Sequence, residues 1–309
     1  NLWRSKPYLE VFRPKSYMSE LPKLKLWFEG ARPKTIPAAV VPVIVGTASV
    51  ESSLSIYKLL LALVVSIALQ VGVNYANDYS DGIRGTDQDR VGPRRLVGSG
   101  LVNAKKVKLA AGISFLVAAI AGLVLAIVTS LFLILIGCLA ILAAWFYTGG
   151  SKPYGYSGFG EISVFVFFGL VATVGSSYVQ SQSIESISIL CSVPVGLLAS
   201  ALLVVNNFRD IETDSETGKQ TFAVRLGKAK TQTFFALLLL GSLGMYVLIA
   251  MLYTYLALIT LVVIPLSLKL IKDIYTKESA DDLIKILENT AKLHLLAGIL
   301  LSIGLVSGL

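Results

Sequence analysis

The chain has 309 residues, of which 55% are hydrophobic and only 15% are charged, and its mean hydropathy is +0.74. Soluble domains carry roughly a quarter charged residues, so this composition excludes an ordinary soluble globule, a disordered chain and a collagen-like protein. Two cysteines and one histidine likewise exclude a disulfide-rich scaffold and a histidine-rich metal site. The composition predicts an all-α, polytopic membrane protein.

A helix that crosses the membrane needs about 20 largely apolar residues, and by that rule the chain contains about nine transmembrane helices. In chain order the expected spans are Lys34–Val50, Lys58–Asn77, Val107–Ala126, Leu131–Thr148, Ile162–Val179, Ile187–Val205, Thr231–Leu252, Tyr255–Ile271 and Ile284–Leu305. The basic segment 1–30 before them lacks the apolar stretch of a signal peptide. We expect a single transmembrane domain over residues 1–309.

Basic residues lie almost entirely on one side of this arrangement. Of the 27 Lys and Arg residues, all except Lys58 and Lys292 precede or open the first span, or fall in alternate loops and the adjoining span ends on the same side. Because cytoplasmic loops attract Lys and Arg, we expect the N-terminus in the cytoplasm and a multi-pass protein of the cell membrane. The same bias explains most of the net charge of +8, so no nucleic-acid partner is expected.

Acidic residues cluster in two short windows on that side. They are Asp78, Asp81, Asp87 and Asp89 after the second span, and Asp210, Glu212, Asp214 and Glu216 after the sixth. Carboxylates near membrane depth are costly and mark functional sites. The alternative is two solvated loop starts, but two matched windows in corresponding halves of the chain favour a shared site.

The spacing within each window indicates the chemistry. Residues four apart share a helix face, so Asn77 and Asp81 form one polar face, and Asn206, Asp210 and Asp214 form another. Such oxygen ligands suit Mg²⁺, which also keeps waters and binds phosphate oxygens. The predicted catalytic acids are Asp78, Asp81, Asp210 and Asp214, and the predicted metal ligands are these four with Asn77 and Asp87.

Cations follow both windows and predict a diphosphate substrate. Guanidinium and ammonium groups beside Mg²⁺ recognise a diphosphate, although each arginine could instead anchor to lipid phosphates. The sequence has no GxxxxGK[ST] loop, which excludes a P-loop nucleotide site. Five aromatic residues lie near the same predicted helix ends: Tyr75, Tyr79, Tyr147, Tyr154 and Phe208. The predicted substrate-binding residues are Asn77, Arg84, Arg94, Arg95, Tyr147, Tyr154, Asn206, Lys219 and Arg225.

At these motifs the sequence resembles the UbiA superfamily of intramembrane prenyltransferases. Members carry an Asn/Asp-rich motif after the second helix and a DxxxD motif after the sixth, matched here by Asn77–Asp81 and Asp210–Asp214. The match is closest to the branch that prenylates 1,4-dihydroxy-2-naphthoate in menaquinone biosynthesis, through Gly92-Pro-Arg-Arg-Leu-Val97 and Pro153-Tyr-Gly-Tyr156. The similarity covers residues 27–230.

The resemblance implies nine helices around a central cavity, capped on the cytoplasmic side by the loops at 80–106 and 208–230. It implies Mg²⁺-dependent transfer of a polyprenyl group from polyprenyl diphosphate to 1,4-dihydroxy-2-naphthoate, with loss of carbon dioxide, beside membrane lipid. One departure concerns the first motif: the broader superfamily often has Asp where this chain has Gly85, and Asp87 follows two residues later. Which acid completes the first metal shell stays open.

Two other functions stay open at this point. A cation-coupled transporter also places acids in the membrane. A related prenyltransferase with another acceptor, such as 4-hydroxybenzoate, would share the fold. The acids here lie at helix ends on one side and alternate with cations, which favours an enzyme that binds diphosphate over a transporter.

Overall fold

The computed structural model describes residues 23–51, 54–86 and 95–308, and every regular element within them is a helix, as expected. In chain order these are α1 (Lys23–Gly30), η2 (Pro33–Thr35), α2 (Ile36–Ala48), α3 (Ile56–Arg84), α4 (Ala104–Val128), α5 (Phe132–Phe146), η3 (Tyr154–Ser157), α6 (Gly160–Val164), η4 (Phe165–Val171), α7 (Ala172–Ser181), α8 (Ser186–Arg209), α9 (Ile211–Glu216), α10 (Phe222–Leu226), α11 (Lys228–Leu252), η5 (Tyr255–Val263), α12 (Ile264–Thr276) and α13 (Ala280–Gly308).

Seven helices in these ranges are long and apolar enough to cross a membrane, which supports a multi-pass membrane protein. They are α3, α4, the continuous helix α6–η4–α7, α8, α11, the continuous helix η5–α12, and α13. The expected count of nine is not confirmed. The remaining two expected spans correspond to α2, with 13 residues, and α5, with 15. Both fall short of the about 20 residues that a span needs.

Local sequence explains why these two helices are short. Before α2, Arg32 adopts a left-handed backbone conformation with φ 54°, and Pro33 then begins the separate turn η2. After α5, Gly150 takes a φ of 78°, which favours glycine and turns the chain away from the helix axis. The apolar windows read from the sequence therefore included residues that form turns.

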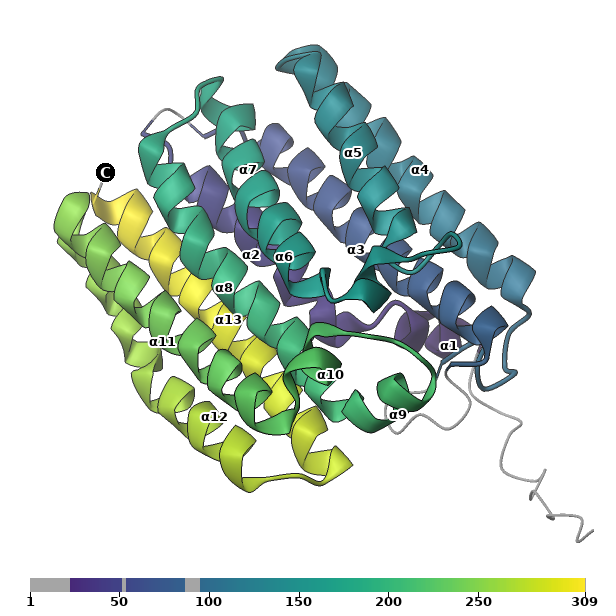
Figure 1. Ribbon diagram of the computed structural model, residues 1–309. Coiled ribbons are helices and arrows are strands. Elements are labelled where there is room, and N and C mark those ends of the chain that lie inside the picture. The colour runs from purple at the N-terminus through teal and green to yellow at the C-terminus, as the bar shows by residue number, and fades with distance from the viewer. Residues whose placement is uncertain (1–22, 52–53, 87–94, 309) are drawn as a thin grey trace, which may run out of the picture.

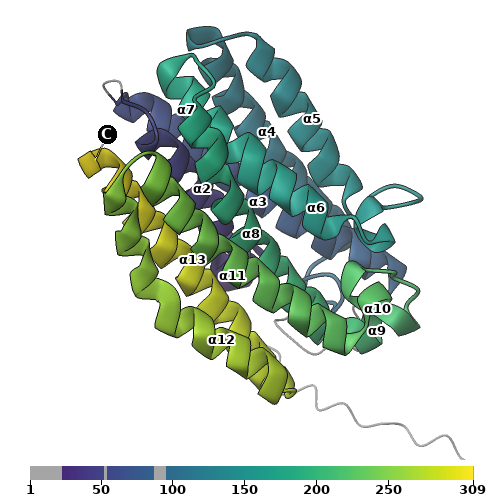
Figure 2. The ribbon, with the colours of Figure 1, turned by 60° about the vertical axis from the view of Figure 1, so that its left-hand side comes forward.

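Helix α8 lies at the centre of the bundle, between α6–α7 on one side and α11 and α13 on the other (Figures 1 and 2). In its most apolar window 72% of the residues are buried, against 17–44% in the other six long helices. The main core joins Leu198 of α8 to Leu239 of α11 and Leu301 of α13. Helices α3, α4 and α5 form the opposite flank of the molecule (Figure 1).

The outer face of α4 is suited to contact with lipid. Leu109, Ile113, Leu116, Ile120 and Leu123 are between 48% and 64% exposed and recur every three or four residues. That spacing places them on one face of the helix. A continuous exposed apolar stripe of this kind is expected where a helix meets hydrocarbon.

Two glycines bring η4 and α8 into close contact. A Cβ atom at Gly169 would lie 2.6 Å from the Cα atom of Gly196, and one at Gly196 would lie 2.7 Å from the Phe165 ring. Helices within a membrane associate through such close packing of small residues. The contact fixes α6–α7 against α8, and both helices form walls of the cavity described below.

The described residues of both acidic windows lie at the same end of the bundle. Helix α3 continues to Arg84, seven residues beyond the expected end of the second span, so the first window begins on the helix itself. The segment after α8 folds into α9 and α10, which lie at this end, whereas the C-terminal end of α13 lies at the other (Figures 1 and 2). The second expected cap segment thus has its own helices.

Candidate active site

A cavity of about 760 Å³ lies between α2, α3, α5, α6–α7 and α8. Its walls are mainly apolar, and its polar residues come chiefly from α3, the end of α8 and the segment that follows α8. On α3 the polar residues are Ser66, Gln70, Asn74, Asn77 and Asp81, spaced four, four, three and four apart. This spacing puts all five on one face of a helix. The cavity is therefore lined by one polar stripe of α3.

The second window faces the same end of the cavity. Asn206, Asp210 and Asp214 all line it, as the four-residue spacing predicts. Asn207 also lines it and donates from Nδ2 to Oε1 of the buried Glu161 at 2.9 Å. The structure thus brings together the two motifs that the sequence placed more than a hundred residues apart.

Lys219 joins the two windows. Its Nζ atom lies 3.4 Å from Oδ1 of Asp81 and 3.8 Å from Oδ1 of Asp214, and all three side chains are buried. Without a cation between them, two buried carboxylates would repel each other. The lysine therefore holds the acids of both windows in one charged cluster.

Tyr156 completes this cluster, although the sequence analysis did not select it. Its hydroxyl donates to Oδ1 of Asp81, and the Lys219 ammonium lies 4.8 Å from the centre of its ring. Burial, and then the negative charge of Asp81, raise the pKa of Tyr156 well above its ordinary value. The tyrosine therefore stays protonated at neutral pH and remains a hydrogen-bond donor to Asp81.

A second cation, Arg209, pairs with Asp210 of the second acidic window. Its Nε and Nη2 atoms each donate to one carboxylate oxygen of Asp210 at 2.8 Å, and Nη2 also donates to Oδ1 of Asn206 at 2.9 Å. This bidentate geometry is the strong form of a guanidinium–carboxylate pair. Arg209 lies between Asn206 and Asp210 in the sequence, and it lines the cavity. Its position between two predicted site residues was the signal that the sequence offered.

Asn77 and Asp78 face different surroundings. Oδ1 of Asn77, which lines the cavity, accepts a hydrogen bond from the Thr148 hydroxyl at 2.8 Å. The Asp78 carboxylate instead accepts from the backbone N–H groups of Leu96 at 2.8 Å and Val97 at 2.9 Å. Asp78 therefore ties the segment that precedes α4 to α3, and its metal role stays a prediction.

The predicted basic residues also divide into two groups. Arg95 lines the cavity with Lys219. Arg84 donates to the backbone carbonyls of Thr148 and Gly150, and Arg225 donates to the carbonyl of Gln220. Neither Arg84 nor Arg225 is among the cavity residues, so both hold loops in this structure. Asp87 and Arg94 lie outside the described residues.

Tyr147 and Tyr154 both line the cavity, with their rings edge-on and 5.5 Å apart. The Tyr154 hydroxyl donates to the carbonyl of Ala143 at 2.8 Å, which leaves the ring as its contribution to the cavity. Phe167 and Phe168 of η4 add two more aromatic side chains to the wall. Aromatic rings thus line the cavity, and their contact with a carbocation stays a prediction.

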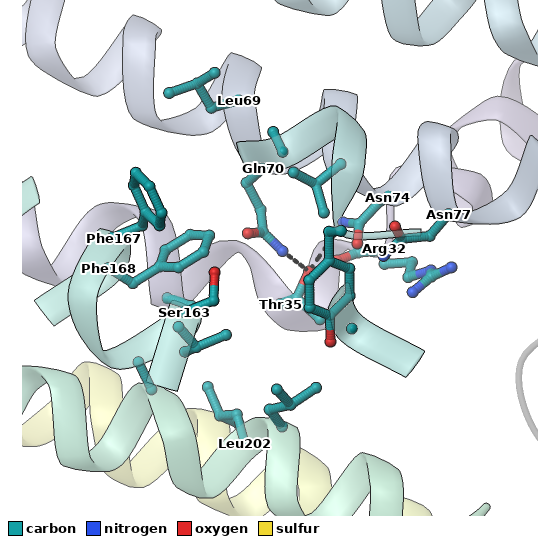
Figure 3. A pocket seen from close by; sticks show the side chains of 18 of the residues that line it. Arg32, Thr35, Leu69, Gln70, Asn74, Asn77, Ser163, Phe167, Phe168 and Leu202 are labelled. Carbon is teal, nitrogen blue, oxygen red and sulfur yellow. Dashed lines mark hydrogen bonds between the residues drawn. The ribbon is translucent and has the colours of Figure 1, made fainter. Parts of the chain in front are cut away.

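A further polar cluster lies midway along α3 and was missed from the sequence. Gln70 and Asn74 both contact the Thr35 hydroxyl, and Asn74 also contacts the backbone of Ala31, next to Arg32 (Figure 3). An amide residue at each of two consecutive turns of an apolar helix was the available signal, because polar groups inside a membrane helix need partners.

The acids of the site do not form a complete set of Mg²⁺ ligands by themselves. Within the described residues no group of three His, Cys, Asp or Glu side chains is close enough to hold an ion. Asp81, Asp210 and Asp214 nevertheless line one end of the cavity with the amide oxygens of Asn77 and Asn206. Mg²⁺ is often held by one or two carboxylates and completed by water and substrate phosphates. This donor set fits that pattern.

Comparison with known proteins agrees with this arrangement. The UbiA prenyltransferase family matches residues 39–296. The 1,4-dihydroxy-2-naphthoate octaprenyltransferase of Mycobacterium leprae is 47% identical over 266 residues, which cover 85% of this chain and 90% of that protein. The Haemophilus influenzae protein of the same name is 39% identical, over 96% of this chain and 100% of its own.

Solved structures show the same fold. A UbiA homologue from Archaeoglobus fulgidus, bound to DMAPP and Mg²⁺, aligns with a TM-score of 0.65 and 14% identity, over 90% of this chain and 99% of that one. The apo structure of a UbiA homologue from Aeropyrum pernix K1 aligns with a TM-score of 0.66 and 13% identity, over 93% and 99% of the two chains. The chain belongs to the UbiA prenyltransferase family.

Proposed function

We propose that this protein transfers a polyprenyl group from polyprenyl diphosphate to 1,4-dihydroxy-2-naphthoate, in a Mg²⁺-dependent reaction that releases diphosphate and carbon dioxide and gives demethylmenaquinol. The meeting of both acidic windows at Lys219, beside an apolar cavity, is the observation that carries the proposal. Two relatives that are 47% and 39% identical to this chain are named 1,4-dihydroxy-2-naphthoate octaprenyltransferase, which supports the choice of acceptor.

In this proposal Asn77, Asp81, Asp210 and Asp214 hold the metal, with Asp78 and Asp87 as further predicted ligands. Bound Mg²⁺ would neutralise charge on the diphosphate and so favour its departure. Lys219 and Arg209, which both line the cavity, offer N–H donors to the diphosphate oxygens. Arg94, Arg95 and Asn206 are further proposed contacts to this substrate.

The apolar part of the cavity then serves the carbon chemistry. The C–O bond to diphosphate breaks and its electron pair leaves with the diphosphate oxygen. Tyr147, Tyr154, Phe167 and Phe168 face the resulting allyl cation with π systems and exclude water. The electron-rich ring of the acceptor bonds to the prenyl carbon. Carbon dioxide leaves and its bonding pair returns to the ring.

The acceptor can be tested with 1,4-dihydroxy-2-naphthoate labelled in its carboxyl carbon. We expect labelled carbon dioxide to appear in step with diphosphate, only when Mg²⁺ and a polyprenyl diphosphate are present. Label retained in the prenylated product would contradict the proposal. Turnover with 4-hydroxybenzoate alone would also contradict it and would assign the chain to another branch of the family.

We further propose that α2 and α5 cross the membrane with the seven long helices, which gives nine spans, and that the N-terminus and the active site face the cytoplasm. The one-sided distribution of basic residues supports this orientation. The segments 80–106 and 208–230 would then cap the cavity from the cytoplasm. Helix α8 separates two exposed positions, Ser183 before it and Thr217 after it.

Those two positions make the orientation testable. In a Cys138→Ala background, which removes the exposed native cysteine, we expect Thr217→Cys to react only with reagents that reach the cytoplasm. Ser183→Cys should react from outside sealed cells, since α8 spans about 36 Å at 1.5 Å per residue. Labelling of Thr217→Cys from outside, with Ser183→Cys protected, would reverse the orientation.

A further inference from the structure

Thr35 fixes the orientation of two amide side chains in the second polar cluster. Its hydroxyl donates to the backbone carbonyl of Arg32 at 2.9 Å, so the Thr35 oxygen can only accept from other groups. Nε2 of Gln70 donates to it at 2.8 Å and Nδ2 of Asn74 at 3.1 Å. The NH₂ groups therefore face Thr35, and the carbonyl oxygens of both amides point away from it.

Those two carbonyl oxygens are acceptors that the described part of the chain does not use. Gln70 is 7% exposed and Asn74 is 3% exposed, yet neither Oε1 of Gln70 nor Oδ1 of Asn74 receives a hydrogen bond from a described residue. Both residues line the cavity. Each oxygen belongs to a nearly buried side chain that lines the cavity and receives no hydrogen bond from a described residue, so each is suited to a ligand hydroxyl.

Arg32 adds a positive group to the same cavity, on the side of Asn77 (Figure 3). Its Nη2 atom is buried and has no hydrogen-bond partner among the described residues, and the side chain lines the same cavity. The left-handed backbone at Arg32 is strained for a residue with a side chain. Asn74 holds the adjacent Ala31 carbonyl at 2.8 Å, which keeps this turn against α3. A guanidinium in this position is suited to an anionic oxygen.

The ligand that satisfies all three groups is a hydroxylated aromatic carboxylate. An anion would meet Arg32, hydroxyl donors would meet Gln70 and Asn74, and a flat ring would meet Phe167 and Phe168 on the facing wall (Figure 3). Asn74 lies seven residues from Asp81 on the same helix face, which is about 10 Å along the axis. That separation leaves room for a bicyclic ring between this cluster and the diphosphate end.

We propose that Arg32, Gln70 and Asn74 bind the head group of the aromatic acceptor, with Thr35 as the positioning residue that orients both amides. Arg32 holds the carboxylate, and the two amide oxygens accept from the ring hydroxyls. This inference rests on the proposed function, because it assigns the acceptor of that reaction to a part of the same cavity.

Binding measurements on the purified full-length protein test the assignment without turnover. The probes are 1-hydroxy-2-naphthoate, 1-naphthol, which lacks the carboxylate, and inorganic diphosphate with Mg²⁺. For Arg32→Gln we expect at least about tenfold weaker binding of 1-hydroxy-2-naphthoate, since a charge-assisted hydrogen bond is lost. Binding of 1-naphthol and of diphosphate should not change. Arg32→Lys should retain part of the affinity for the carboxylate.

Thr35→Val keeps the shape of the side chain and frees both amides to rotate. We expect it to weaken the binding of 1-hydroxy-2-naphthoate and of 1-naphthol by similar factors. Unchanged binding of diphosphate would show that the variant is folded. Lys105→Gln is the matched control, because its side chain is exposed and it is not among the residues that line the cavity. It should bind all three probes as the unaltered protein does.

Several results would overturn the assignment. If Arg32→Gln weakens the binding of diphosphate instead of 1-hydroxy-2-naphthoate, the guanidinium binds the polyprenyl diphosphate and not the acceptor. If Arg32→Gln and Thr35→Val both bind the naphthoate normally, the cluster is not the acceptor site. Selective binding as expected, in a protein that releases no labelled carbon dioxide, would uphold this site and refute the proposed reaction.

Discussion

Asp81→Asn and Asp210→Asn should each lower the turnover number at least about a hundredfold, as loss of one preorganised charge-stabilising group does in other enzymes. Asp81 is in contact with Lys219 and Tyr156, and Asp210 with Arg209, so each carboxylate orients a donor as well as being a predicted metal ligand. An amide keeps the size of the side chain but removes the charge. The measurement is the rate of diphosphate release at saturating substrates and Mg²⁺.

The double variant should lose far less than the product of the two single losses, because both acids belong to one assembly. Glu212→Gln is the matched control. This acid lies in the same window, but it is exposed and pairs only with Lys228 among the ion pairs of the described residues. Exposed pairs contribute little, so near-normal turnover is expected. Near-normal turnover of folded Asp81→Asn or Asp210→Asn would contradict the site.

Sequence reasoning could predict the acid pairs because they follow helix periodicity. Asn77 and Asp81 are one turn apart on α3, and Asp210 and Asp214 follow the end of α8 at the same spacing. Carboxylates at membrane depth are too costly to be incidental, so the pattern carried information about function. The contact through Lys219 then needed only that both helix ends lie on the same side, which the basic loops indicated.

Residue type did not distinguish side chains that line the cavity from side chains that hold loops. Asp78 lies one position after Asn77, which turns it by about 100° on an α-helix, so it meets the backbone of Leu96 and Val97 instead of the cavity. Arg84 and Arg225 likewise satisfy backbone carbonyls. A cation near a phosphate site and a cation that ties a loop have the same sequence signature.

The missed residues depend on contacts between distant segments. Tyr156 reaches Asp81 across 75 positions of the chain, and Gln70 reaches Thr35 across 35. Nothing in the local pattern of either segment specifies its partner. The expected count of nine spans is not confirmed for a related reason: the first expected span, Lys34–Val50, includes Lys34 and Thr35 of the separate turn η2 and two residues beyond the end of α2.

Lys219 also bears on how a metal could enter. With the ammonium 3.4 Å from Asp81 and 3.8 Å from Asp214, the lysine already supplies positive charge to both predicted ligands. The Arg209 guanidinium supplies it to Asp210. Metal that arrives without diphosphate must compete with these cations. When diphosphate arrives with the metal, each displaced cation gains phosphate oxygens as new partners. The two ligands should therefore bind cooperatively.

Lys219→Met should reduce turnover at least about a hundredfold, because it removes a buried charge from the predicted diphosphate site. Methionine preserves the length of the side chain and leaves Asp81 and Asp214 facing each other without their shared cation. We therefore expect the same variant to bind Mn²⁺, as a spectroscopic substitute for Mg²⁺, more tightly than the unaltered protein when diphosphate is absent. Added diphosphate should tighten Mn²⁺ binding less in the variant.

Lys228→Met is the matched control for this experiment. Its side chain is 54% exposed and pairs with Glu212, away from the cavity residues. Loss of this exposed pair should leave turnover and Mn²⁺ binding close to those of the unaltered protein. If Lys219→Met instead weakens Mn²⁺ binding without diphosphate, the lysine orients the carboxylates for the metal and does not compete with it. If turnover is also unchanged, Lys219 has no part in binding the diphosphate.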